Sequence, residues 1–335
     1  MRKTFLTPEQ HELYLSILDE YEKYRSLSND EKENLILQIT STPFINLLCD
    51  WAFKHVFGNN KQNLMMLLND FLPEEVIDIE YDPNETDPLK GDDKQIIMDV
   101  MCHTKTGKFL VEMQRSEKEG FRNRMAYYGA GSIFKQLKKG DPYQKLVPVY
   151  VICFMNFCLS HSTNQLVYHY QIREQESGEF YGNQLSIVLC ELPRFILEPD
   201  RKLSPVEEWF EILRNMSNFT ARPAHVNKRF DPIFEASRQT RLVELEQQQY
   251  FRAMLTEEEK QDIATAYLKR GREEGLREGF EKGMEKGIEQ GMAEGHREAS
   301  RIHAMKLLER KVDIDTIVFV TGLSKEEVIQ LQLQV

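Results

Sequence analysis

Two short segments with strand character, residues 95–103 and 108–114, are joined by the sequence Thr104-Lys105-Thr106-Gly107. A glycine-containing connection of this length between two apolar runs predicts a β-hairpin. Residue 103 pairs with residue 108 whether the loop has two or four residues, so residue 99 falls opposite residue 112. We therefore expect Asp99 and Glu112 to face each other across the hairpin.

Side chains alternate between the two faces of a strand, so Gln114 should share the face of Glu112, whereas Phe109, Val111 and Met113 should point the other way. Two carboxylates directly opposite each other repel, and a partly buried pair can hardly both be ionised without a cation. Hard divalent metals take oxygen ligands of this kind. The hairpin therefore predicts a metal site that contains both acids.

The composition is that of a soluble protein with more than one domain, since the chain has 335 residues, of which 41% are hydrophobic and 29% charged. No apolar run approaches the roughly 20 residues that a membrane span needs, and the N-terminus lacks the apolar core of a signal peptide. We expect a cytoplasmic location and no membrane partner. Five cysteines without Cys-x-x-Cys spacing argue against disulfides and a structural zinc site.

Charge is unevenly distributed along the chain. The net charge of −11 argues against a surface coated with basic residues, yet residues 115–145 contain eight basic and three acidic residues. A cationic wall that begins one residue after the acid cluster suits a phosphodiester substrate. The alternative interpretation is an ordinary solvated helix face.

The order of predicted elements indicates an α/β fold with a mixed sheet. Residues 1–40 form a helical N-terminal extension, and residues 41–220 form the α/β domain. In that domain, apolar runs predict strands at residues 76–81, 147–157, 167–173 and 184–191 besides the hairpin, and helical spacing predicts helices at residues 44–57, 62–71, 121–138 and 205–216.

The C-terminal third differs in kind. Seven glycines recur every four residues among charged residues: Gly271, Gly275, Gly279, Gly283, Gly287, Gly291 and Gly295. Each glycine costs a helix about 1 kcal/mol relative to alanine, which suggests that the stripe is compensated by close approach of another backbone. We expect residues 221–300 to form a self-associating helix, with a flexible charged linker as the alternative.

The last segment, residues 301–335, predicts a small helical hairpin with short helices at residues 304–310, 314–321 and 324–333. Gly322-Leu323-Ser324 supplies the turn and the helix N-cap. The pattern resembles a helix-turn-helix, but small helical hairpins often bind no DNA. Contact with DNA by this segment therefore remains open.

Several short motifs occur in the order and spacing of a known family. They are residues 50–58 (DWAFKHVFG), Asp99-Val100, residues 111–114 (VEMQ), residues 124–128 (RMAYY), residues 139–143 (KGDPY) and residues 191–195 (ELPRF). Together they resemble the Rpn family of recombination-promoting nucleases and transposases, a branch of the PD-(D/E)XK nuclease superfamily. The resemblance covers roughly residues 42–215. It implies a restriction-endonuclease-like mixed sheet flanked by helices.

The resemblance assigns roles to four residues. Asp99 matches the acid of the PD motif, Glu112 the acid of the E-x-K motif, and Asp50 an acid of the preceding helix. Gln114 stands where the superfamily usually has lysine, and Met98 stands where it has proline. The E-x-Q form looks typical of this branch. A neutral amide can only orient the attacking water, so more of the activation must come from the metal.

The expected activity is that of a metal-dependent DNA endonuclease in recombination or mobile-element processes. Asp99 and Glu112, with the backbone carbonyl of Met113, should hold one or two Mg²⁺ ions, or Mn²⁺ in their place. Gln114 should position the water, and Asp50 should bind a second ion or its hydration shell.

Phosphate contacts are expected from Arg122, Arg124 and Lys135. The C-terminal tail should make the enzyme a homo-oligomer, so that paired sites can cut both strands. One alternative function is a non-catalytic module that binds DNA or a partner, and another is a nuclease whose substrate is RNA.

Overall fold

The computed structural model describes residues 6–84, 96–159, 163–198 and 200–333; within the long C-terminal helix, the side chains of residues 257–281, 285, 288, 289 and 293 lie outside the description. The chain divides into two compact units, Met1–Ala264 and Thr265–Val335, and each is described by itself. The predicted divisions at residues 40, 220 and 300 stay predictions.

The first unit is built on a six-stranded sheet in the order β1-β2-β3-β4-β6-β5. The strands are β1 (Glu80–Tyr81), β2 (Val100–His103), β3 (Lys108–Gln114), β4 (Val149–Met155), β5 (Val167–Arg173) and β6 (Phe180–Glu191). The neighbours β3, β4 and β6 run parallel, whereas β1, β2 and β5 pair antiparallel. The prediction of a mixed sheet is confirmed.

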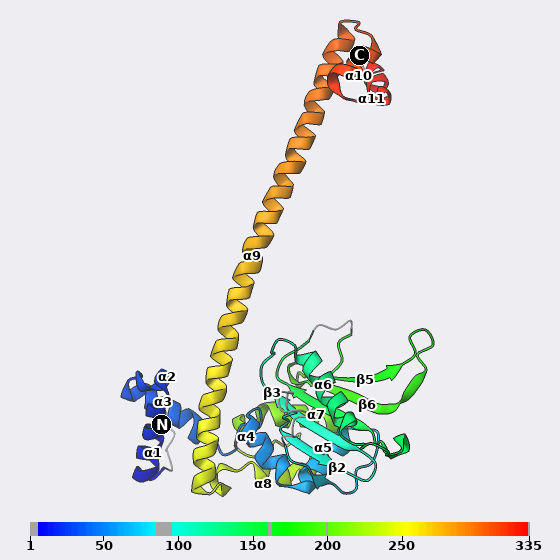
Figure 1. Ribbon diagram of the computed structural model, residues 1–335. Coiled ribbons are helices and arrows are strands. Elements are labelled where there is room, and N and C mark those ends of the chain that lie inside the picture. The colour runs from blue at the N-terminus through cyan, green and yellow to red at the C-terminus, as the bar shows by residue number, and fades with distance from the viewer. Residues whose placement is uncertain (1–5, 85–95, 160–162, 199, 334–335) are drawn as a thin grey trace. The chain divides into compact units, whose positions relative to one another are not determined.

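Helices cover both faces of this sheet (Figure 1). All seven residues of the central strand β4 are buried, as expected for a strand with both faces covered. On one face, Phe109 and Val111 belong to a large core shared with α4 (Asp50–Phe53), α5 (Lys61–Phe71), α7 (Pro205–Asn215) and α8 (Asp231–Ala236). On the other face, Leu110 and Cys153 pack against α6 (Phe121–Phe134).

The N-terminal helices are α1 (Pro8–Glu20), α2 (Glu22–Arg25) and α3 (Asn29–Thr40). Ser28 forms a capping box with Glu31 at the start of α3. Tyr14 packs against Phe251 of α9 (Glu244–Glu309), with ring centroids 4.5 Å apart. These helices therefore add to the main core of the first unit.

Several predicted boundaries were wrong. The helix expected at residues 44–57 begins only at Asp50, because Phe44 pairs as an isolated bridge with Arg238 and the backbone N–H of Ile45 donates to the carbonyl of Ser237 (2.8 Å). Tertiary pairing thus overrides the helical spacing of this segment. The helix expected at residues 121–138 ends at Phe134. The strand expected at 76–81 is confined to β1, and β6 begins four residues earlier than predicted.

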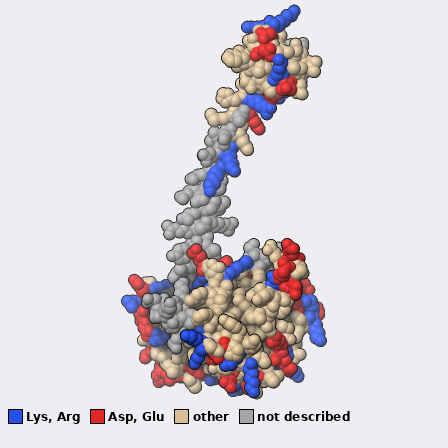
Figure 2. Space-filling view, turned by 45° about the vertical axis from the view of Figure 1, so that its right-hand side comes forward, with Lys and Arg blue, Asp and Glu red and all other residues tan. Residues whose placement is uncertain are grey.

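Acidic and basic side chains alternate on the surface of the first unit. Figure 2 shows them interspersed on the face in view, where the described residues form no continuous basic surface. This distribution agrees with the net charge of −11. Among the described helices, none is long and apolar enough to cross a membrane.

The second unit contains the end of α9 with α10 (Ile314–Thr321) and α11 (Lys325–Gln332). The predicted turn is confirmed, because Gly322 ends α10 with φ of 69° and Ser324 caps α11. A small core holds these helices together: Ala304, Leu308, Ile317, Leu323, Val328 and Leu331.

The glycine stripe lies on α9. A Cβ placed on Gly283, Gly287, Gly291 or Gly295 meets no described atom within 4 Å, so this part of the stripe faces open space. The earlier glycines of the repeat lie outside the residues whose surroundings the structure describes.

Candidate active site

The hairpin has the register that the sequence predicts. Val100 lies opposite Val111 and His103 opposite Lys108, so Asp99, one residue before β2, continues the ladder opposite Glu112. The backbone N–H of Asp99 donates to Oε2 of Glu112 (3.1 Å). Oδ2 of Asp99 accepts from the backbone N–H of Met113 (2.7 Å). These two hydrogen bonds fix both carboxylates where the two strands meet.

Both acids lie in an environment that disfavours their negative charge. Asp99 is 4% exposed, and the side chain of Glu112 is 13% exposed. Burial, followed by the charge of Asp50, raises the pKa of Asp99 above its ordinary value. Burial, followed by the charge of Asp99, raises the pKa of Glu112. The buried pair is therefore more stable with a bound proton or cation than with two unpaired negative charges.

Two side-chain cations flank the pair. Nζ of Lys54 lies 3.3 Å from Oδ1 of Asp99, and Nη2 of Arg124 lies 3.7 Å from Oε1 of Glu112. Each cation lowers the pKa of the acid beside it, but neither offsets the burial. Each acid therefore keeps a raised pKa while it has a basic neighbour.

Gln114 is oriented by hydrogen bonds at both ends of its amide. Its Oε1 accepts from Nη2 of Arg124, and its Nε2 donates to the backbone carbonyl of Ser116 (2.9 Å). The amide still has one N–H and one lone pair for a further partner. Gln114 can therefore orient a water molecule while Arg124 holds it in place.

Asp50 opens α4 and acts on both acids through its charge. It is close enough to raise both pKa values. Even so, no three His, Cys, Asp or Glu side chains among the described residues converge into a metal-binding group. The nearest side-chain donors for an ion are thus the pair Asp99 and Glu112, with Asp50 beyond them.

The donor set fits a hard divalent cation. Two carboxylates lie side by side, both are ligands that Mg²⁺ and Mn²⁺ accept, and burial raises the cost of leaving them charged and unpaired. Lys54 and Arg124 neutralise the pair only in part, since the Arg124 contact with Glu112 is a loose one, at 3.7 Å.

The three residues that were predicted to contact phosphate lie in different places. Arg124 turns into the site, as described above. Arg122 is exposed in the first turn of α6, and residues two apart on a helix do not face the same side. Lys135 follows the other end of α6, which is about 20 Å away for a helix of this length. Its neighbour Gln136 binds Val147, at the end of the sheet opposite Gln114.

Lys54 was missed as a site residue. From the sequence it reads as a partner of Asp50 one helical turn earlier. In the structure it begins a π-helical turn, Lys54–Gly58, and its Nζ reaches Asp99. Such turns are frequent at functional sites. The only signal in the sequence was a cation four residues after the helix acid.

Comparison of the sequence with known protein families identifies the family of this chain. The sequence model of the PD-(D/E)XK nuclease family transposases matches residues 47–267. The chain belongs to this family. The matched segment includes Asp50, Lys54, Asp99, Glu112 and Arg124, and it continues past the predicted limit near residue 215. No curated protein and no solved structure matched the chain.

Membership in the PD-(D/E)XK nuclease family supports a nuclease or transposase-like function. Nucleases of this family generally use divalent metal ions, and a nuclease of this kind has DNA as its substrate.

Proposed function

We propose that this PD-(D/E)XK family member is a Mg²⁺-dependent DNA endonuclease that acts in recombination or the movement of genetic elements. The observation that carries the proposal is the pair Asp99 and Glu112, buried side by side and held by backbone hydrogen bonds beside two basic side chains. An acid that serves only in a structural ion pair need not be buried beside a second acid, where both pKa values are raised.

Asp99 and Glu112, with the backbone carbonyl of Met113, would hold the ion, and Asp50 would bind its hydration shell or a second ion. A bound Mg²⁺ lowers the pKa of water and neutralises charge on the phosphate. Gln114 orients the attacking water through its free amide capacity. Lys54 places a positive charge beside Asp99, where it stabilises negative charge that develops in the transition state.

The direct test is incubation of the full-length protein with supercoiled plasmid in Mg²⁺ and in EDTA. Nicked and linear products that need the metal are expected. A protein that binds the plasmid but leaves it intact in Mg²⁺ and in Mn²⁺ contradicts catalysis and favours the non-catalytic binding module. A parallel incubation with single-stranded RNA tests the choice of substrate.

Arg124 is a positioning residue in this scheme. Changing Arg124→Lys keeps the charge but replaces the planar guanidinium, whose Nη2 contacts both Gln114 and Glu112, with a shorter side chain. We expect kcat to fall by roughly 10–100-fold with a small change in KM, since the ion site loses its orienting partner. Steady-state cleavage of a fluorescent duplex measures both constants.

Arg122→Lys is the matched control for Arg124, because Arg122 sits on the same helix and points away from the acids. If both variants lose kcat alike, the loss is a general effect of replacing an arginine on this helix and the positioning role is wrong. A rise in KM alone for Arg122→Ala fits its predicted contact with phosphate.

Self-association through α9 is part of the proposal, supported by glycines that face open space. Replacing Gly283, Gly287, Gly291 and Gly295 with alanine should strengthen the isolated helix by about 1 kcal/mol at each position. Close backbone approach would nevertheless be lost, so light scattering should show a smaller oligomer. An unchanged mass, together with raised helicity, contradicts association through this stripe.

A further inference from the structure

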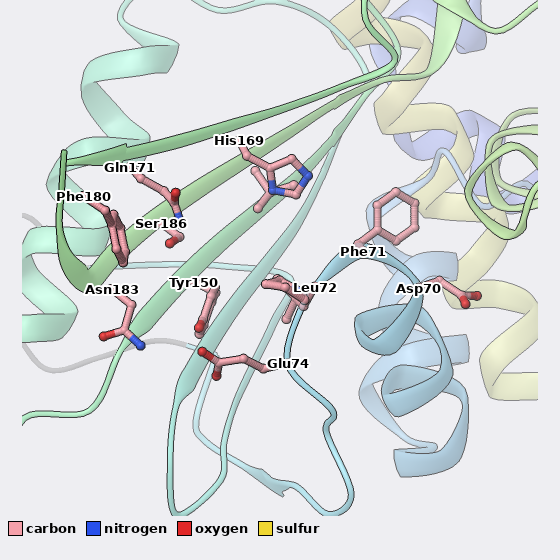
Figure 3. A pocket seen from close by; sticks show the side chains of 12 residues that line it. Asp70, Phe71, Leu72, Glu74, Tyr150, His169, Gln171, Phe180, Asn183 and Ser186 are labelled. Carbon is pink, nitrogen blue, oxygen red and sulfur yellow. The ribbon is translucent and has the colours of Figure 1, made fainter. Parts of the chain in front are cut away.

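A hollow lies on the sheet face opposite the two acids. It has a volume of about 610 Å³ (Figure 3). Tyr150 in its wall shares the core of Phe109, whereas Cys153, beside Glu112 in the register, belongs to the core under α6. Its lining residues are Asp70, Phe71, Leu72, Pro73, Glu74, Tyr150, His169, Gln171, Phe180, Asn183, Ser186 and Val188. The mechanism proposed above uses none of them.

The floor is a row of hydrogen-bonding side chains across three strands. Ser186 of β6 lies opposite Tyr150 of β4 and opposite Gln171 of β5. Neighbouring strands are about 4.8 Å apart, so the three groups form a continuous polar line. Ser186 is 5% exposed, and its Oγ finds no hydrogen-bond partner among the described residues. A buried hydroxyl of this kind favours a ligand that supplies the missing bond.

An irregular stretch of the β5–β6 hairpin forms one end of the pocket. The pairing shifts after Gln171, and Gly182 has φ of 152°, in the region that favours glycine. Figure 3 shows Phe180 and Asn183 together at this end, with His169 at the other. The shift thus brings a flat aromatic ring and a second amide beside the polar row.

The ring of Tyr150 is also fixed. It stacks on Phe109 with ring centroids 5.4 Å apart and an angle of 13° between the planes. Burial, and then its hydrogen bond with Glu74, raises the pKa of Tyr150, so the phenol stays neutral. Tyr150 is 3% exposed and forms a rigid, uncharged boundary, so the ring of Phe180, which is 42% exposed, is the aromatic surface on which a planar ligand can stack.

The charge of the lining disfavours anionic ligands. The described lining contains no Lys or Arg and includes the carboxylate of Glu74, although Arg173 lies beside it, where it donates to Oε1 of Gln171 (3.2 Å). Asp70 is engaged elsewhere, by Arg229 (2.7 Å) and Trp209 (2.6 Å). Burial lowers the pKa of His169, so it adds no positive charge near neutral pH. Phosphate and carboxylate groups are disfavoured here.

We propose that this pocket binds an uncharged nucleobase, with a purine preferred, and that the ligand's phosphate, if it has one, stays outside. The amide of Asn183 presents a donor beside an acceptor, which matches the paired donor and acceptor on a purine edge. Gln171 adds its N–H donors and the lone pair of Oε1 that does not accept from Arg173. Glu74 accepts from an exocyclic amino group. Phe180 stacks on the ring, and a volume near 600 Å³ is typical of small-molecule sites.

The test is calorimetry of the full-length protein in EDTA, where cleavage is absent, with adenosine, guanosine, cytidine and uridine as probes. At least one purine nucleoside should bind with a Kd below about 1 mM, and its 5′-monophosphate should bind more weakly. Ser186→Ala removes the hydroxyl without breaking an internal hydrogen bond, so it should fold as the parent does. It should weaken binding about 3- to 10-fold.

Gln171→Leu should weaken binding at least as much as Ser186→Ala, and Gln175→Leu on the exposed turn of the same hairpin is its matched control. The proposal is overturned if no nucleoside binds at 5 mM, if the monophosphate binds more tightly, or if the Ser186 and Gln171 variants bind as the parent does. These readings are independent of catalysis by Asp99 and Glu112.

The base can come from a free nucleoside or from a DNA strand. A short single-stranded oligonucleotide and the same strand with abasic positions separate the two sources. Displacement of adenosine by the first but not the second identifies a base carried by DNA. No displacement by either identifies the free compound. Displacement by both strands alike points to the backbone and contradicts recognition of a base.

Discussion

Plasmid cleavage in Mg²⁺ should fall by about 10³-fold or more when Asp99 is changed to asparagine, because one carboxylate ligand of the ion is lost and several kcal/mol of transition-state stabilisation go with it. The change is nearly isosteric, and the new side-chain oxygen can still accept from the backbone of Met113. Glu112→Gln should have a similar effect. The initial rate of nicking measures both.

Glu119→Gln is the matched control, since Glu119 is exposed in the segment before α6 and contacts neither acid. It should cleave at the parent rate. The double variant of Asp99 and Glu112 should be no slower than either single one, because residues that act as a unit are not additive. An Asp99→Asn protein that cleaves as fast as the parent removes this site from the mechanism.

Local rules explain why the acid pair could be predicted. The alternation of strand side chains and the length of the loop together allow one register, and the structure has that register from Val100 to His103. The same alternation placed Glu112 and Gln114 on one face. Both predictions rest only on contacts between segments that are adjacent in the sequence.

The parts that sequence reasoning missed depend on tertiary contacts. Lys54 reaches Asp99 because a π-helical turn begins at that residue, and no local preference announces such a turn. Phe44 leaves its predicted helix to pair with a segment almost two hundred residues later. The pocket over Ser186 depends on a shifted register between β5 and β6. The first two features join elements that are distant in the chain, and the third depends on an irregular pairing within one hairpin.

The acid pair should also make the metal-free fold pH-dependent. Burial raises both pKa values in the folded state, with the charge of Asp50 adding to the shift of Asp99 and that of Asp99 to the shift of Glu112, whereas the unfolded chain keeps ordinary values near 4. The folded state therefore binds more protons. Its free energy of unfolding in EDTA should fall as pH rises from about 4 and level off above the raised pKa values.

Asp99→Asn removes one of the two unfavourable charges, so at pH 8 in EDTA it should raise the free energy of unfolding by roughly 1–3 kcal/mol. Thermal unfolding should then show a Tm several degrees above that of the parent. Added Mg²⁺ or Mn²⁺ should raise the Tm of the parent and leave that of the variant nearly unchanged, because only the parent binds the ion in its folded state.

Glu119→Gln again serves as the control, and its Tm should follow the parent in EDTA and in metal. If Asp99→Asn lowers the Tm in EDTA, the Asp99 carboxylate stabilises the fold through Lys54 and Met113. Its raised pKa then gives no support to a metal site. If the variant gains stability but metal leaves the parent unchanged, the pair stores unfavourable charge without binding an ion. A metal-binding acid pair requires that Asp99→Asn lose activity and gain stability in EDTA. The carboxylates that hold the ion destabilise the fold when no ion is bound.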